Sequence, residues 1–235
     1  MVNRVATFPY TNSMIVENMR LQTKYSDVNS QISSGLISQD YKGIARDSQY
    51  LQAVESSKSK LDAYNANCNT SLATINIMYT SLGKIEDLAN SMLGNVTAAL
   101  GGKQVPAAVM SSQANNALTE TAGILNQKVA GRHIFSGSDI DTAPVDLSDP
   151  AWTPQTSPSV VNASYYQGNN TINSVQASET LNIGYGVTAN NPAFEELFRA
   201  YNLLSNNPTG TAELQEASTL IQKAIDDLAN VQGNL

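Results

Sequence analysis

A long apolar repeat runs through residues 61–96, and its steps alternate between three and four residues throughout. Side chains with this spacing lie along one line of an α-helix, and a repeat of about 3.5 residues is typical of coiled coils. Flanking apolar residues widen the stripe, which favours a bundle with more than one partner helix. The repeat consists of Leu61, Tyr64, Cys68, Ser71, Ile75, Met78, Leu82, Ile85, Ala89, Met92 and Val96, and Leu72, Tyr79, Leu88 and Leu93 flank it.

Weaker forms of the same pattern lie on both sides of this helix. Residues 33–43 contain two glycines and predict a bend or loop. Gly101 and Gly102 are typical stop signals, and Pro106 can begin a further helix that extends to about residue 130. Upstream of the bend, the three-and-four stepping passes through Leu21, Tyr25, Val28, Ile32 and Leu36.

Two helices are predicted near the end of the chain. Asn191 followed by Pro192 suits an N-cap and a first helical position. After the break at 205–210, a final stripe is still in phase at Leu235, although Gly233 could end it. We therefore expect that the natural helix continues beyond this chain. The final stripe consists of Leu214, Ala217, Ile221, Ala224, Leu228 and Val231.

Residues 131–190 differ in composition from the rest of the chain. They are rich in Pro, Ser, Thr, Asn and Gly, and short runs with strand character lie between the turn residues. This pattern predicts a small β-rich insertion between the third and fourth helices. We expect the N- and C-terminal helices to pack side by side, with the β-rich part at one end of the resulting rod.

Charge and composition exclude several classes of function. The net charge is −7, so an electrostatic footprint for nucleic acid is absent, and we expect no nucleic-acid partner. No apolar run reaches signal-peptide or membrane-span length, so we expect neither a cleaved signal peptide nor membrane insertion. Cys68 is the single cysteine and cannot form an internal disulfide.

His133 is the single histidine and lies near Ser136 and Asp139. A catalytic histidine needs a nucleophile and an orienting acid in a pocket, and nearness in sequence does not supply that geometry. We expect a packing or hydrogen-bonding role for the imidazole and no enzymatic activity. A hydrolase that uses His133 is the opposing hypothesis.

The remaining polar features also have structural interpretations. Asp139, Asp141, Asp146 and Asp149 lack the glycine and closing glutamate of a calcium-binding EF-hand loop, so no metal or other cofactor is expected. Polar residues on or beside the helical stripes are either exposed flanks or determinants of helix register. These are Lys58, Asn65 and Glu86.

Several segments resemble bacterial flagellins, and more closely the hook-associated protein 3 family at the hook–filament junction. "QISSG" (31–35) resembles the family's N-terminal "SG" segment, and residues 48–90 resemble the helix after it. "GRHIFSGSDIDTAPV" (131–145) is similar to the family's turn after the third helix, and "YYQGNNTINSVQASETLNIGYGV" (165–187) to its following segment. The chain departs from the pattern in the stretch 36–47, at Val145 where the turn usually has Phe, and in lacking the family's last C-terminal helix.

The resemblance implies a non-enzymatic structural protein. Such subunits leave the cell unfolded through the flagellar type III pathway, without a cleaved signal peptide, and polymerise outside it. The implied partners are further copies of the chain, hook-associated protein 1 and flagellin, with an export chaperone possible. A short flagellin is the alternative within the class, and a surface adhesin or binding module on the same scaffold is the alternative outside it.

The expected fold is mainly α, a long-helix bundle of flagellin type with a small β domain at one end. The expected domains are a partly mobile N-terminal polymerisation segment (1–40), a rod of long helices (41–132 and 191–235) and a β-rich insertion (133–190). The candidate residues for structure and assembly are Leu21, Tyr25, Val28, Ile32, Gly35, Leu61, Ile75, Leu82, Gly131, Phe135, Gly137, Pro144, Ile221 and Leu228.

Overall fold

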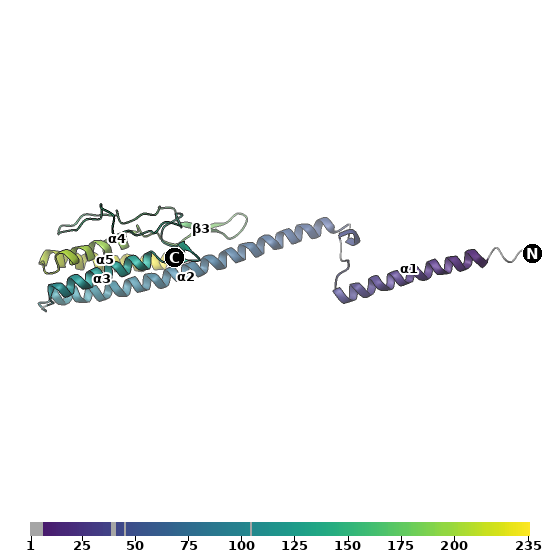
Figure 1. Cartoon of the computed structure of the whole chain (residues 1–235), viewed down its shortest axis with the longest axis horizontal. Helices are drawn as coiled ribbons and strands as arrows, with labels where there is room; N and C mark the ends of the chain where they lie inside the picture. Colours follow the sequence, from purple (N-terminus) through teal and green to yellow (C-terminus); the bar gives the residue numbers. More distant parts are fainter. Residues whose placement is uncertain (1–6, 39–40, 45, 104) are drawn as a thin grey trace, which may run out of the picture. The chain divides into compact units, whose positions relative to one another are not determined.

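The structure is a computed structural model that describes residues 7–38, 41–44, 46–103 and 105–235. Within these ranges it is mainly helical, with small antiparallel strand pairs, as the sequence predicted (Figure 1). The chain divides into two compact units, one up to Asp62 and one from Ala63 to Leu235. No helix in the described part is long and apolar enough to cross a membrane.

The first unit contains α1 (Thr7–Ser34), the short 3-10 helix η1 (Tyr41–Ile44) and the start of α2 (Ser48–Leu100). The bend predicted over 33–43 is confirmed, because α1 ends at Ser34. The hydroxyl of Tyr41 donates a hydrogen bond to Glu55 Oε2 over 2.8 Å, which ties η1 to α2. Residues 1–6 and 39–40 of the predicted N-terminal segment lie outside the described residues.

The second unit is built on the C-terminal part of the predicted stripe. Six of its apolar members are buried to 3 % exposure or less and lie in one hydrophobic core with residues of the later helices. Their three-and-four spacing keeps them on one side of α2, where they can all face the same partners. These residues are Met78, Leu82, Ile85, Ala89, Met92 and Val96.

The predicted stop of the long helix is confirmed at its two glycines. Lys103 N donates to the carbonyl of Ala98 over 3.0 Å and Gly102 N to that of Ala99 over 3.1 Å, the hydrogen-bond pattern of a Schellman motif. Pro106 then occupies the N-cap of α3 (Ala107–Leu125).

The prediction that the third helix reaches about residue 130 was wrong, because α3 ends at Leu125. The chain instead enters a hairpin of β1 (Lys128–Val129) and β2 (Arg132–His133), with Ala130 and Gly131 between the strands. Both turn residues have positive φ, 50° and 81°, which is the requirement of a type I′ turn. Gly131 therefore belongs to the turn of a β-hairpin and does not end a helix.

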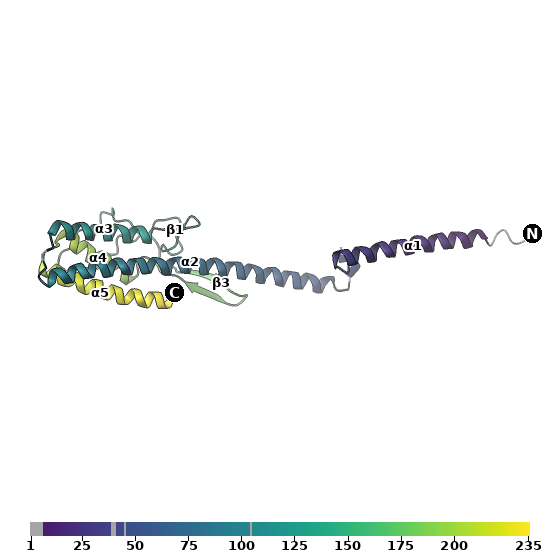
Figure 2. The ribbon, with the colours of Figure 1, turned by 90° about the horizontal axis from the view of Figure 1, so that it is seen from below.

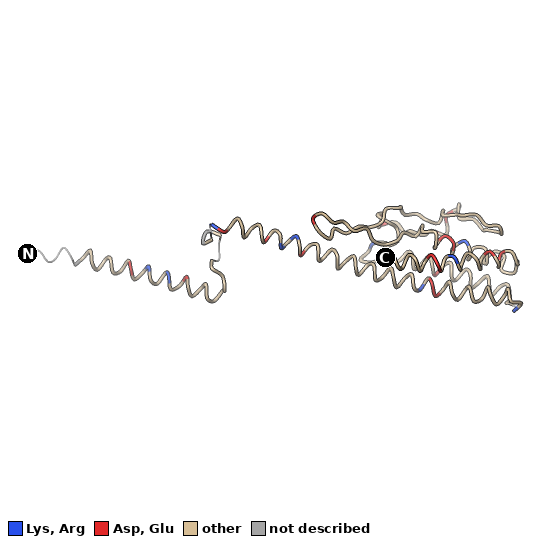
Figure 3. The backbone as a smooth tube through the Cα atoms, turned by 180° about the vertical axis from the view of Figure 1, so that it is seen from behind, with Lys and Arg blue, Asp and Glu red and all other residues tan. Residues whose placement is uncertain are grey.

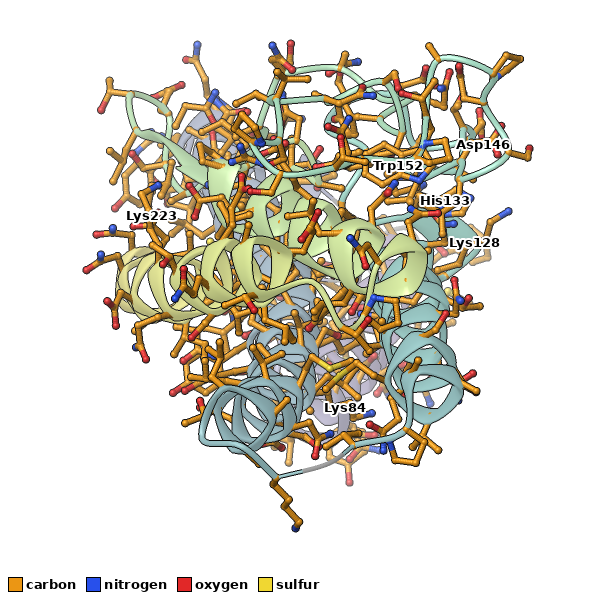
Figure 4. The ribbon with its side chains drawn as sticks, turned by 90° about the vertical axis from the view of Figure 1, so that its left-hand side faces the viewer. Lys84, Lys128, His133, Asp146, Trp152 and Lys223 are labelled. Atoms are coloured by element: carbon orange, nitrogen blue, oxygen red, sulfur yellow. The ribbon has the colours of Figure 1, made fainter. Side chains whose placement is uncertain are left out.

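The helices of the second unit form two layers. The C-terminal part of α2 and α3 make one layer, and α4 (Pro192–Asn206) and α5 (Thr211–Asn234) make the next (Figures 1 and 4). The view from below in Figure 2 shows α4 between α3 and α5. The predicted start of α4 is confirmed, because the Asn191 side chain accepts a hydrogen bond from Ala193 N over 3.1 Å.

Residues 133–190 cover α4 as a third layer and do not form a body at one end of the helices (Figures 1 and 4). This corrects the expected placement, and its cause is aromatic packing: Tyr165 and Trp152 lie against Phe198 of α4 at ring separations of 4.6 and 6.3 Å. The segment is also less regular than predicted. Beyond the end of β2, its named strands are β3 (Asn173–Gln176) and β4 (Asn182–Tyr185), which pair antiparallel.

The central position of α4 explains its unusual burial. Phe194, Leu197, Phe198 and Tyr201 are fully buried, and even Glu195 and Glu196 are only 5 % exposed. A helix buried on all sides has neighbours all round it, which here are α3, α5 and the layer formed by residues 133–190 (the irregular layer). The predicted stripe of α5 is likewise buried at Leu214, Ala217, Ile221, Ala224 and Leu228.

Candidate assembly surface

The described side chains of α1 are exposed from Phe8 to its end at Ser34. Four of the candidate residues form a stripe on this helix, because their spacing of four, three and four residues returns to the same side. Their exposed fractions are 61 % for Leu21, 76 % for Tyr25, 51 % for Val28 and 76 % for Ile32. Leu21, Tyr25 and Val28 also line a shallow hollow on the surface of this helix.

Apolar exposure on α1 extends beyond this stripe. A helix gains little stability from its own backbone hydrogen bonds, and in proteins most helical stability comes from packing an apolar face. Contiguous exposed apolar surface of this kind marks an interaction site. The further exposed apolar residues are Phe8, Tyr10, Met14, Ile15, Val16 and Met19.

The charges on α1 balance. It carries Glu17, Arg20, Lys24 and Asp27, two of each sign, within a chain of net charge −7. Figure 3 shows these blue and red positions interspersed along the helix. Glu17 and Arg20 approach to 3.9 Å with both side chains about two-thirds exposed. Such a pair contributes little to stability, so the apolar residues dominate what this surface can bind.

The start of α2, in the same unit, continues the exposed apolar series with Tyr50, Val54 and Leu61. Leu61 is 65 % exposed, so the first member of the predicted stripe is not part of the core. Gly35 lies just after α1, and its N–H donates to the carbonyl of Gln31 over 2.8 Å.

The other candidate residues on helices lie inside the second unit. Leu82, Ile221 and Leu228 are fully buried, and Ile75 is half-buried. Gln232 Nε2 of α5 lies 3.4 Å from Glu86 Oε2 of α2, so these two helices are in contact near the end of α5. These residues therefore belong to the second unit and most of them to its core, whereas the candidate residues of α1 and Leu61 are exposed.

The predicted turn is a tightly packed structural feature. Phe135 is fully buried, its ring lies edge-on to that of Phe194 at 6.3 Å, and its carbonyl accepts a hydrogen bond from Ala189 N over 2.8 Å. Gly137 has a φ of 72°, and a Cβ there would overlap the carbonyl oxygen of Asn169. The buried Pro144 accepts a hydrogen bond from the backbone of the same later segment, at Gln167 N over 2.9 Å.

His133 does not form a catalytic arrangement with its neighbours. It is 6 % exposed, and its Nδ1 is buried with no hydrogen-bond partner among the described residues. Ser136 donates its hydroxyl to the backbone carbonyl of His133 over 3.4 Å and not to the imidazole. The described residues also contain no group of three or more His, Cys, Asp or Glu side chains that could hold a metal ion.

Two glutamates, the buried Glu195 and the half-buried Glu216, bind residues 133–190 to the helices, a feature that the sequence analysis did not identify. Glu195 Oε1 accepts a hydrogen bond from Asn162 N over 3.0 Å and faces Arg199 Nε at 3.2 Å. Glu216 Oε1 accepts one from Ser159 N over 2.9 Å and another from the Ser159 hydroxyl. The signal in the sequence was a pair of adjacent glutamates inside an apolar helix, with Arg199 four residues after the first.

The surroundings shift the pKa values of Glu195 and Glu216 in opposite directions. Burial raises the pKa of Glu195, although the Asn162 backbone and Arg199 oppose the shift. Burial also acts to raise the pKa of Glu216, but hydrogen bonds from Ser157 and Ser159 outweigh it, so that this pKa is lowered. The neighbouring Glu196 pairs with Lys223 of α5, which in turn lies 3.5 Å from Asp227.

The chain matches no protein-family model and no curated protein. Among solved structures it is similar to FlgL from Bacillus cereus, with a TM-score of 0.62 and 13 % identity over 79 % of this chain and 87 % of that one. It is also similar to a putative flagellar hook-associated protein from Vibrio parahaemolyticus, with a TM-score of 0.55 and 16 % identity over 84 % and 90 %.

The chain has the fold of flagellar hook-associated proteins. The mainly α fold with small antiparallel strand pairs, which the sequence predicted, is thereby confirmed. In the hook-associated fold of this chain, the second unit carries the packed core, and the exposed apolar residues gather on α1 and the start of α2.

Proposed function

We propose that this chain is a structural subunit of the bacterial flagellum that joins the hook to the filament and polymerises outside the cell. The observation that carries the proposal is the exposed apolar surface of α1, on a chain with the hook-associated fold. A surface of this kind is typical of protein–protein contacts, so structural assembly is the function that it supports best.

Assembly would bury the stripe formed by Leu21, Tyr25, Val28 and Ile32. Burying an aliphatic side chain of this size contributes about 1.5–3 kcal/mol, so a handful of such contacts can offset the ordering of a helix. The proposed partners are further copies of the chain, hook-associated protein 1 and flagellin. We further propose export through the flagellar type III pathway without a cleaved signal peptide, with or without a dedicated chaperone.

Electron microscopy of a deletion strain tests the proposed junction role. Loss of filaments with intact hooks, restored by the wild-type gene, is the expected result. Filaments that form normally without the chain would contradict the junction role. If the hooks of the deletion strain still carry the hook-associated proteins and lack only the filament, the chain is instead a short flagellin. If the strain loses surface attachment alone, the chain is an adhesin.

A pair of matched variants tests whether the α1 stripe is the assembly surface. Val28→Lys places a charge on the stripe, whereas Thr23→Lys places the same charge elsewhere on the same exposed helix. We expect Val28→Lys to be exported but to fail to restore filaments, because burying an unpaired ammonium is costly. Thr23→Lys should restore them, and equal behaviour of the two variants would contradict the proposal.

A further inference from the structure

A cleft of about 300 Å³ lies in the second unit between α2, the β1–β2 hairpin and the β3–β4 hairpin. Val129, Ile134 and Ile140 supply apolar side chains to its walls. Its volume is at the lower end of the range for ligand pockets. The remaining lining residues are Thr70, Thr74, Ala130, Arg132, His133, Asn173 and Tyr185.

The charge of this cleft is opposite to that of the chain. Among the described residues, Arg132 is the one charged side chain that lines the cleft, and no Asp or Glu of this part does so, although the chain carries 20 acidic residues against 13 basic ones. Lys128 lies beside it, because it is the direct partner of His133 in the β1–β2 ladder. Figure 4 shows Lys128 and His133 close together at the same edge of the unit.

His133 lines this cleft and is itself almost fully buried. The residue is 94 % buried, since it is 6 % exposed, and its Nδ1 has no hydrogen-bond partner in the described structure. A buried polar atom without a partner is destabilising, and native structures rarely retain one without a reason. The positive φ of Ala130 and Gly131 forms the turn of the β1–β2 hairpin, and this hairpin places His133 at the wall of the cleft.

We propose that this cleft binds a small apolar carboxylate. The hydrocarbon or aromatic body of the ligand lies against Val129, Ile134 and Ile140, and its carboxylate pairs with the guanidinium of Arg132, which suits planar carboxylates. His133 lines the cleft next to Arg132, so its imidazole ring lies where it can sense a bound ligand. The proposal is independent of the flagellar role, because every residue involved lies within the second unit.

The single histidine gives this proposal a specific probe. The imidazole Cε1–H resonance of the full chain belongs to His133 alone and can be followed by NMR during titration with hexanoate. We expect a saturable shift with a dissociation constant of about 1 mM or somewhat below, because so small a ligand rarely binds more tightly. Hexanamide has the same body without the charge and should bind at least about tenfold more weakly.

Two variants complete the test. Arg132→Met removes the guanidinium from an exposed side chain and should weaken hexanoate binding at least about tenfold without changing the circular dichroism spectrum. Lys84→Met removes a positive charge from an exposed position on α2 and should leave binding unchanged. The absence of a saturable shift in the wild-type chain, equal binding of hexanamide, or unchanged binding in Arg132→Met would each overturn the proposal.

Discussion

Asn126 and Val145 are joined by two hydrogen bonds of 2.8 Å, although they lie 19 residues apart. The Asn126 amide donates to the carbonyl of Val145 and accepts from its N–H, so one side chain satisfies both backbone groups of a residue that is 4 % exposed. This connection fixes the predicted turn to the end of α3, because Asn126 is the C-cap of that helix. The Asn126 side chain thereby makes the two hydrogen bonds that the backbone of a neighbouring strand would otherwise make.

We expect Asn126→Ala to lower the free energy of unfolding by about 2 kcal/mol or more, since it leaves a buried N–H and a buried carbonyl without partners. Urea denaturation followed by circular dichroism measures the change. Asn116→Ala is the matched control, because Asn116 is exposed on the same helix, and it should change the stability by less than about 0.5 kcal/mol. A similar loss in both variants would show that the Asn126–Val145 connection is unimportant.

The helices were predictable to the extent that their signals are local. The stepping from Met78 to Val96, the Gly101–Gly102 stop and the Asn191 N-cap each depend on residues within one or two helical turns. Leu61 belongs to the same repeat but is exposed, because periodicity identifies a side of a helix and not how far along it the partners extend.

The features that sequence analysis missed depend on distant residues. The end of α3 at Leu125 rests on Val145, which nothing in the helix sequence indicates. The placement of residues 133–190 over α4 rests on contacts such as Trp152 with Phe198, whose residues lie far apart in the chain. The buried Glu195 became understandable only when its hydrogen-bond partner Asn162 was known.

The second prediction concerns Leu82, a residue of the α2 stripe that is fully buried in the core. Leu82→Asp should lower the free energy of unfolding by about 4 kcal/mol or more, because it removes apolar contacts and places a carboxylate where no partner exists. Lys84→Ala, two residues further along at an exposed position, should change it by less than about 0.5 kcal/mol. Thermal and urea unfolding measure both effects. Equal losses of unfolding free energy in the two variants would contradict the conclusion that the α2 stripe faces the core.

The carboxyl groups of Glu195 and Glu216 predict opposite dependences of stability on pH. Glu195 has a raised pKa in the folded state, so the folded chain holds that proton more tightly than the unfolded one. Its contribution to stability therefore grows as pH falls through the folded pKa toward the ordinary value of 4.5. Glu216 has a lowered pKa, so its stabilising effect is present above 4.5 and is lost as pH falls through the folded value.

Urea unfolding of the wild-type chain, Glu195→Gln and Glu216→Gln from about pH 7 to below about pH 4 tests these signs. The wild type should gain stability relative to Glu195→Gln as pH falls toward 4.5, and should lose its advantage over Glu216→Gln below 4.5. Parallel curves for the two variants would show that the carboxylates do not differ as proposed.

We expect His133→Phe to leave the fold intact, with a change in the free energy of unfolding within about 1 kcal/mol. The substitution removes a buried Nδ1 that has no partner, which favours the variant, while the larger ring must fit among packed neighbours, which opposes it. Thermal unfolding and a swarming assay of the complemented strain measure the outcome. A folded and exported variant that abolished motility would point to a chemical role for the imidazole.

The last prediction concerns the contrast between α1 and α4. Side chains of α1 are exposed from Phe8 to its end, whereas α4 is buried on all sides, so local opening of α1 should require far less free energy. In a dilute, monomeric sample we expect the amides of α1 to exchange with deuterium at least about a hundredfold faster than those of α4, which provides the internal reference. Light scattering establishes that the sample is monomeric. If α1 is an assembly surface, its protection should rise with protein concentration while that of α4 stays constant. Strong protection of α1 in the monomer would contradict its assignment as a surface that awaits a partner.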